Sequence, residues 1–111
     1  MSKVYVPQLP SRYDAATRLW VPSINIDDAK KFGDVVVMLP PNANRLHISP
    51  LVVALREQMR HYTKDDWVVA VGDPSLIAAA ACIAGKSTGG VIRLLKWDRQ
   101  SAQYIPVEMN I

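Results

Sequence analysis

The residues most suggestive of chemistry lie between Ala80 and Ser87, where Ala-x-x-x-x-Gly-Lys-Ser satisfies a loose form of the phosphate-binding loop, with alanine replacing the first glycine. A working phosphate loop follows a strand directly and wraps its backbone N–H groups around the phosphates as a helix begins. Here the spacer residues belong to an apolar, alanine-rich helical stretch, Leu76 to Ala84, which Gly85 is expected to end. Lys86 would then lie at the negative end of the helix dipole, where phosphate is repelled. The expected position of this pattern, at the end of a helix, therefore argues against nucleotide binding here.

A larger set of polar side chains lies in the segments that follow three apolar runs of the chain. If those runs are parallel strands, the segments meet at the carboxyl edge of the sheet, where open α/β sheets usually bind their ligands. We therefore predict a candidate ligand rim at this edge, made of Asn42, Asn44, Arg45, His47, Asp73, Ser75, Asp98 and Arg99.

Catalysis by this rim is the less favoured interpretation. His47 with Asp73 or Asp98 would make an acid–base pair, but no second half of a triad is visible and a lone loop histidine is more often a surface residue. Asp73 directly precedes Pro74, which is typical of a helix N-cap, and its carboxylate would repel a bound anion. We assign no catalytic residue and expect no cofactor; the chain leans towards a non-enzyme.

The basic residues offer a different kind of candidate site. Arg56 and Arg60 stand one helical turn apart, and with Lys64 they define a candidate basic binding face. Arg93, Lys96 and Arg99 could extend this face. Such a face can bind nucleic acid or an acidic partner. The net charge is only +3 and the basic residues are scattered, so a solvated helix face is favoured and nucleic acid is a secondary partner.

Metal binding and export are both disfavoured by composition. One cysteine and two distant histidines form no familiar ligand spacing, so no metal site is predicted. Cys82 is expected to be a small buried thiol, and a reducing cytoplasm suits a chain with no possible internal disulfide. The longest apolar run, Leu76 to Ala84, is too short to span a bilayer, and no signal segment opens the chain, so no membrane partner is expected.

The hydrophobic pattern predicts an α/β fold from Asp34 onward. Unbroken apolar runs predict strands at 35–39, 67–71 and 91–97, while alternation and Pro106 predict a half-exposed edge strand at 104–111. Ser49-Pro50 and Asp73-Pro74 each resemble the start of a helix. The order predicts a small sheet of three parallel strands plus an antiparallel C-terminal edge strand, with two crossover helices. At least two of the three tryptophans are expected in the core.

Residues 1–33 are predicted to form an irregular N-terminal arm packed on an α/β domain at 34–111, within a single compact domain overall. The prolines break this segment into short patches, and a turn at Asp14–Thr17 would pair Val4–Val6 with Leu19–Val21 as a hairpin. Asp27 to Phe32 would make a helical turn that Gly33 ends. The arm is expected to cover the alanine-rich helix.

Several of these segments together resemble small uncharacterised proteins encoded by tailed bacteriophages. The resemblance covers most of the chain and is carried by Val71-Gly72-Asp73-Pro74, the alanine-rich helix, Leu94 to Arg99 and Tyr104-Ile105-Pro106-Val107. It transfers no catalytic or binding residue. It implies a protein that acts in the cytoplasm of an infected bacterium.

Two functions follow from these observations. The first is a non-enzymatic interaction protein that binds a host or viral macromolecule, or its own copy through the edge strand 104–111. The alternative is a small-molecule or nucleotide-binding enzyme that uses the ligand rim, with Asp73 and His47 as its working residues.

Overall fold

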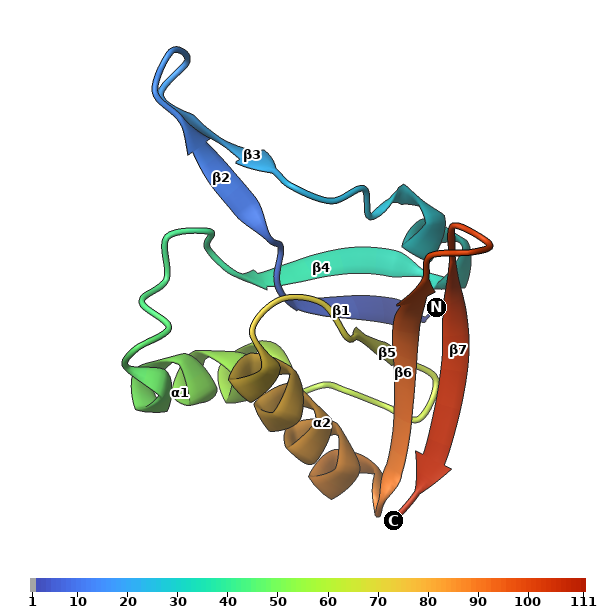
Figure 1. Ribbon diagram of the computed structural model, residues 1–111. Helices are drawn as coiled ribbons and strands as arrows, with labels where there is room; N and C mark the ends of the chain where they lie inside the picture. Colours follow the sequence, from blue (N-terminus) through green and yellow to red (C-terminus); the bar gives the residue numbers. More distant parts are fainter. Residues whose placement is uncertain (1) are drawn as a thin grey trace.

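A computed structural model describes residues 2–111 as a five-stranded sheet with helices on both faces (Figure 1). The strand order is β4-β1-β5-β6-β7, in which β7 alone is antiparallel to its neighbour. The α/β class and the antiparallel C-terminal edge strand are therefore confirmed. The sheet is formed by β1 (Lys3–Gln8), β4 (Asp34–Leu39), β5 (Trp67–Val69), β6 (Val91–Asp98) and β7 (Gln103–Asn110). Among the described residues, no helix is long and apolar enough to cross a bilayer.

Strand β1 corrects the expectation that the first 33 residues lie outside the sheet. It pairs in parallel with both β4 and β5, so the sheet has four parallel strands where three were predicted, and β1 lies between β4 and β5. Its side chains alternate between two cores, because Tyr5 faces the helices while Val4 and Val6 face the opposite side. Pro7 has no N–H to donate, and the pairing of β1 with β5 ends before it, at Tyr5.

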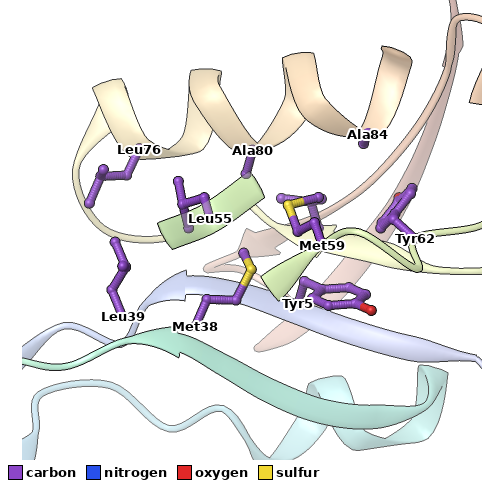
Figure 2. Close-up of a cluster of buried hydrophobic side chains, with 10 residues drawn as sticks. Tyr5, Met38, Leu39, Leu55, Met59, Tyr62, Leu76, Ala80 and Ala84 are labelled. Atoms are coloured by element: carbon purple, nitrogen blue, oxygen red, sulfur yellow. The ribbon is translucent and has the colours of Figure 1, made fainter. Parts of the chain in front are cut away.

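Helices α1 (Ile48–Gln58) and α2 (Pro74–Thr88) lie side by side on one face of the sheet and form the larger core with it (Figures 1 and 2). Leu55 and Met59 of the α1 segment are completely buried there, as their helical spacing predicts. Helix α1 begins at Ile48, earlier than the Ser49-Pro50 pair predicts, and its N-cap residue His47 makes no capping hydrogen bond with its side chain.

Helix α2 begins as predicted and ends later. Asp73 is its N-cap and accepts a hydrogen bond from the Ser75 N–H at 3.0 Å. Gly85 does not end the helix: a Cβ there would lie 3.3 Å from Cδ1 of Ile92, so the glycine gives close helix–strand packing and the helix continues to Thr88. Gly89, at φ +70°, is the actual C-cap. Lys86 thus lies in the last helical turn, in agreement with the argument against a phosphate loop.

The outer side of α2 is not covered by the N-terminal segment, contrary to expectation. The buried residues of the helix form one stripe, Leu76, Ala80, Ala84 and Thr88, and Cys82 is exposed instead of buried. The N-terminal segment lies on the other face, where the 3-10 helix η1 (Asp27–Phe32) covers the second core through Ala29. The predicted helical turn and its end at Gly33 are confirmed.

The hairpin also differs from the prediction in one of its strands. Its turn falls after Asp14 as expected. The strand that pairs with β3 (Leu19–Pro22) is β2 (Ser11–Asp14), because Val4–Val6 belongs to β1 and pairs within the five-stranded sheet. The Ser23 N–H donates to the Pro10 carbonyl at 2.7 Å and closes the base of the hairpin. The hairpin projects away from the body of the domain (Figure 1).

Candidate functional site

A cavity of about 380 Å³ lies where the parallel strands β1, β5 and β6 end. Its lining comes from those strand ends, from the segment between the hairpin and η1, and from the start of β7: Pro10, Ile24, Asn25, Val71, Gly72, Trp97 and Tyr104. Apolar side chains predominate, and no charged residue is among them. Its volume and its mostly apolar lining fall within the range of known small-molecule pockets.

The cavity lies at a reversal in the winding of the sheet. The chain leaves β1 towards β4 on the η1 face, whereas the later connections through α1 and α2 use the opposite face. The direction of winding therefore reverses between β1 and β5. In doubly wound sheets, a crevice opens outside the carboxyl ends of the strands at such a reversal, and ligands bind there. Pro10 and Gly72, which follow β1 and β5, both line the cavity.

None of the predicted rim residues lines this cavity, although two adjoin residues that do. Asp73 follows Gly72 and serves as the α2 cap, beside Ser75. Asp98 follows Trp97 and accepts hydrogen bonds from the hydroxyl and N–H of Ser101, which hold the pKa of Asp98 below its ordinary value. Arg99 is exposed in the same turn.

The remaining rim residues lie after β4, on the far side of β1 from the cavity. Asn44 accepts a hydrogen bond from the Leu46 N–H, a local turn contact. Asn42, Arg45 and His47 are exposed. Among residues 2–111, His47 makes no hydrogen bond or ion pair with Asp73 or Asp98, so the acid–base pair is not assembled in this structure.

The predicted rim contains no residue that lines the cavity, because β1 was not recognised as a strand of the sheet. Pro10 is adjacent to the site only when β1 lies between β4 and β5. Gly72 follows β5 with a φ of +93°, and a Cβ there would lie 3.0 Å from the Gln8 carbonyl oxygen, so the ends of β1 and β5 approach each other closely at this residue. At least two of the three tryptophans were expected in the core, but Trp67 alone is buried, and Trp20 and Trp97 are each 42% exposed.

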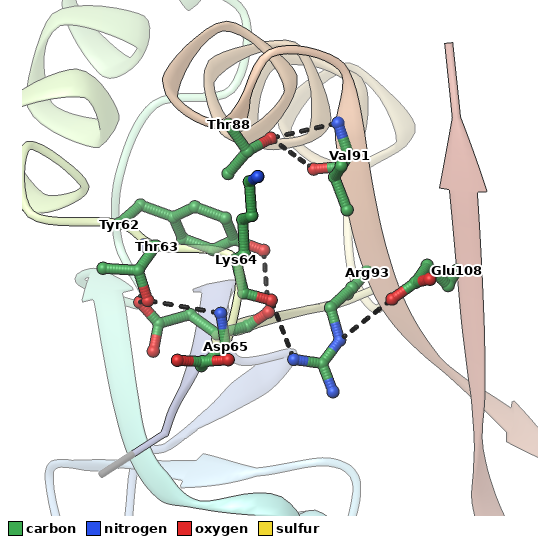
Figure 3. A network of polar contacts seen from close by, with 9 residues as sticks. Tyr62, Thr63, Lys64, Asp65, Thr88, Val91, Arg93 and Glu108 are labelled. Atoms are coloured by element: carbon green, nitrogen blue, oxygen red, sulfur yellow. Dashed lines mark hydrogen bonds and ion pairs between the residues drawn. The ribbon is translucent and has the colours of Figure 1, made fainter.

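A polar network at the opposite, amino end of the strands has a structural role (Figure 3). The buried carboxylate of Asp66 accepts hydrogen bonds from the Lys3 N–H and the Thr63 N–H, each at 2.8 Å, and from the Thr63 hydroxyl. The Tyr62 hydroxyl donates to the Asp66 carbonyl, and burial raises the pKa of Tyr62, with a smaller contribution from the Asp66 charge. These contacts tie the start of β1 to the turn before β5.

Arg93 belongs to this network and does not extend the basic face. Its guanidinium lies 3.7 Å from the ring centroid of Trp67 and donates to the Lys64 carbonyl at 2.8 Å. Its Nε lies 3.7 Å from Glu108 on β7. Of the predicted basic face, Arg56, Arg60 and Lys64 are exposed, and Arg60 forms an ion pair with Glu57 at 3.1 Å.

The hairpin carries the largest group of exposed apolar side chains on one element. Tyr13, Leu19 and Trp20 are 52%, 63% and 42% exposed. Tyr13 and Trp20 face each other across the two strands and pack edge to face, with ring centroids 5.6 Å apart. Arg12 and Arg18 on the same hairpin are exposed as well.

Comparison with protein families identifies the family of this chain. The family model described as Phage Pam3 gp32-like protein matches residues 2–111. The chain belongs to this family. The resemblance to small phage-encoded proteins is thereby confirmed, and the chain fits a phage accessory protein. Comparison with curated proteins and with solved structures gave no match.

The description of the Phage Pam3 gp32-like family names neither an activity nor a ligand. Among residues 2–111, no group of three His, Cys, Asp or Glu side chains is placed to hold a metal ion. The candidate functional features of this structure are the neutral cavity at the strand ends and the aromatic hairpin.

Proposed function

We propose that the protein is a non-enzymatic phage accessory protein that binds a host or viral protein through the β2–β3 hairpin in the cytoplasm of an infected bacterium. The observation that carries the proposal is the exposure of Tyr13, Leu19 and Trp20 on an element that projects from the domain (Figure 1). Exposed apolar groups of this kind on a soluble protein mark interaction surfaces.

The composition of the hairpin supports protein recognition. Tyr, Trp and Arg are the residues enriched among interface hot spots, and this short element offers Tyr13, Trp20, Arg12 and Arg18. An isolated two-stranded hairpin is marginally stable in water, so a partner that buries the aromatic pair would also stabilise the element. The arginines favour an acidic rim around the partner's apolar pocket.

The test is capture of a partner from phage-infected cells with wild-type protein and hairpin variants. The double variant Tyr13→Ala/Trp20→Ala is expected to lose the captured partner while its melting temperature changes little, because both side chains are about half exposed. Val53→Ala, at an apolar position on α1 that is 60% exposed, serves as the control and is expected to retain the partner. Equal capture by the double variant and wild type would remove the hairpin from the proposal.

Nucleic acid is a secondary partner, through Arg56, Arg60 and Lys64. Phosphate contacts release counterions, so binding to nucleic acid must weaken steeply as salt rises. Binding to single- or double-stranded DNA that is unchanged between low and moderate salt, or absent, excludes this face as a nucleic-acid site. Glu57 neutralises part of the face through its ion pair with Arg60, which makes the protein partner the stronger proposal.

The cavity favours a second candidate function, the binding of a neutral small molecule. Its volume and position at the winding reversal support a ligand, and the lack of a charged lining residue disfavours nucleotides. A panel of neutral aromatic metabolites in a thermal-shift assay tests it. A saturable rise in melting temperature that Gly72→Val abolishes, in a variant shown to remain folded by circular dichroism, supports the cavity; no rise across the panel argues against it.

A further inference from the structure

The two free edges of the sheet are very different, and the difference points to a partner for one of them. β4 and β7 are the edge strands. The Asp34 N–H donates to the Ser2 carbonyl beside β1, so the backbone of Asp34, Val36 and Met38 is directed towards β1. By alternation, the N–H and C=O groups of Val35, Val37 and Leu39 are directed away from the sheet.

The free edge of β7 is largely closed to another strand. The Tyr104 N–H, on the outer side of β7, donates a hydrogen bond to the Asp28 carboxylate at 2.7 Å. Pro106, next on that side, has no N–H to offer. Charge follows at Glu108, which is exposed. Capping groups, proline and charge are the devices by which edge strands avoid pairing.

The free edge of β4 has none of these devices between Asp34, its first residue, and Pro40, which follows its last. From Val35 to Leu39 it has neither proline nor charge, and the run is rich in β-branched residues. Val37 is 44% exposed on this strand and Val35 is partly exposed, whereas Leu39 is buried in the larger core. An apolar edge without these devices is a site for strand addition.

We propose that β4 pairs with β4 of a second copy of this chain, antiparallel about a two-fold axis at Val37, so that two sheets become one. The β4 sequence is complementary to itself in this register. Val37 meets Val37, each Val35 meets Leu39, and each outward N–H finds an outward C=O.

The side chains also suit this pairing. The cross-strand neighbours on both faces are apolar, with Val36 beside Met38 of the other copy, and Asp34 meets Pro40 so that no like charges face each other. The interface uses neither the hairpin nor the cavity. The dimer proposal can therefore be tested independently of the binding functions proposed above.

Solution mass is the first test. The wild-type protein is expected to sediment as a dimer at micromolar concentration, and Val37→Pro as a monomer, because proline removes an outward donor that bonds nothing within the monomer. Asn110→Pro, the matched substitution near the end of β7, is expected to remain dimeric. A wild-type monomer at all concentrations overturns the proposal, as does an Asn110→Pro monomer beside a dimeric Val37→Pro.

A second variant, Val37→Lys, serves as a control in case Val37→Pro does not fold. Val37→Lys would bring two lysines together at the axis and is expected to be a folded monomer, with its melting temperature measured at the same concentration. Wild-type mass for both Val37 variants contradicts the interface.

Cross-linking tests the register itself. Residues opposite each other in a hydrogen-bonded antiparallel pair have Cα atoms about 5.5 Å apart, within the range of a disulfide. In a Cys82→Ser background, Val37→Cys is expected to form a covalent dimer under mild oxidation, whereas Val36→Cys, which does not meet its own copy, is not. Equal cross-linking of the two variants would exclude the axis at Val37.

Discussion

The Asp28 carboxylate accepts a hydrogen bond from the backbone N–H of Tyr104 at 2.7 Å, joining η1 to the first residues of β7. This contact satisfies an outward backbone donor of an edge strand and fastens the N-terminal segment to the C-terminal strand. The same backbone hydrogen bond is the main reason that the pKa of Asp28 lies below its ordinary value; Lys31 contributes in the same direction.

This lowered pKa predicts an acid-sensitive contribution to stability. Since the folded-state pKa of Asp28 lies below its ordinary value of 3.8, the contribution is present above pH 3.8 and is lost as the pH falls through the lower folded-state value. Asp28→Asn keeps an acceptor but cannot titrate. Its melting temperature is expected to fall less than that of wild type as the pH is lowered from about 5 to about 2.

Asp28→Ala separates the hydrogen bond from the charge. It leaves the Tyr104 N–H without its partner and is expected to melt below Asp28→Asn at neutral pH. Asp27→Asn is the control, because Asp27 is exposed and pairs only with Lys30 in the same turn. If the melting temperature of Asp28→Asn falls as steeply with decreasing pH as that of wild type, the pH dependence comes from other carboxylates, such as Asp98.

Asp66→Asn is expected to destabilise the fold although it is nearly isosteric. Both carboxylate oxygens of Asp66 accept backbone N–H groups, one from Lys3 and one from Thr63. An amide turns one of these oxygens into a donor that faces another donor, so the expected cost is about 2 kcal/mol. Urea denaturation measures it, with exposed Asp65→Asn as the control. A cost below about 0.5 kcal/mol would contradict the network's structural role.

The parts of the fold that were predicted correctly have local signals. Asp73-Pro74 determines a helix start by capping and by the fixed φ of proline, and the β-branched run at Val35–Val37 needs no neighbour to indicate a strand. Pro106 correctly placed the last strand at an edge because a missing donor is a property of the residue itself.

The errors concern features that depend on distant residues. Val4–Val6 is a short patch followed by Pro7, which argues against a central strand; its place is set by packing on both faces, which no local pattern contains. Gly85 resembles a helix end, but its lack of a Cβ serves contact with Ile92 of the next strand. The cavity was missed for the same reason, since it requires β1 to bring Pro10 beside Gly72.

Substitution at Asp73 tests whether this residue is a cap only. Asp73→Asn retains a good capping side chain and is expected to leave the free energy of unfolding almost unchanged, whereas Asp73→Ala is expected to cost about 1 kcal/mol. Both are measured by urea denaturation. If Asp73→Asn loses as much stability as Asp73→Ala, then the carboxylate charge contributes something beyond the single hydrogen bond to Ser75.

Gly72→Ala tests the close approach of β1 and β5 that forms the floor of the cavity. Gly72 has a φ of +93°, which an alanine adopts only with strain, and a Cβ there would lie 3.0 Å from the Gln8 carbonyl oxygen, part of a central strand that cannot easily move. The expected cost is about 2 kcal/mol. Gly89→Ala is the matched control, because Gly89 has a φ of +70° but a Cβ at that position would meet no other atom within 4 Å. The excess cost of Gly72→Ala over Gly89→Ala in urea denaturation measures the contact with β1, and equal costs would mean that backbone strain alone, and not the meeting of the strand ends, requires glycine at this place.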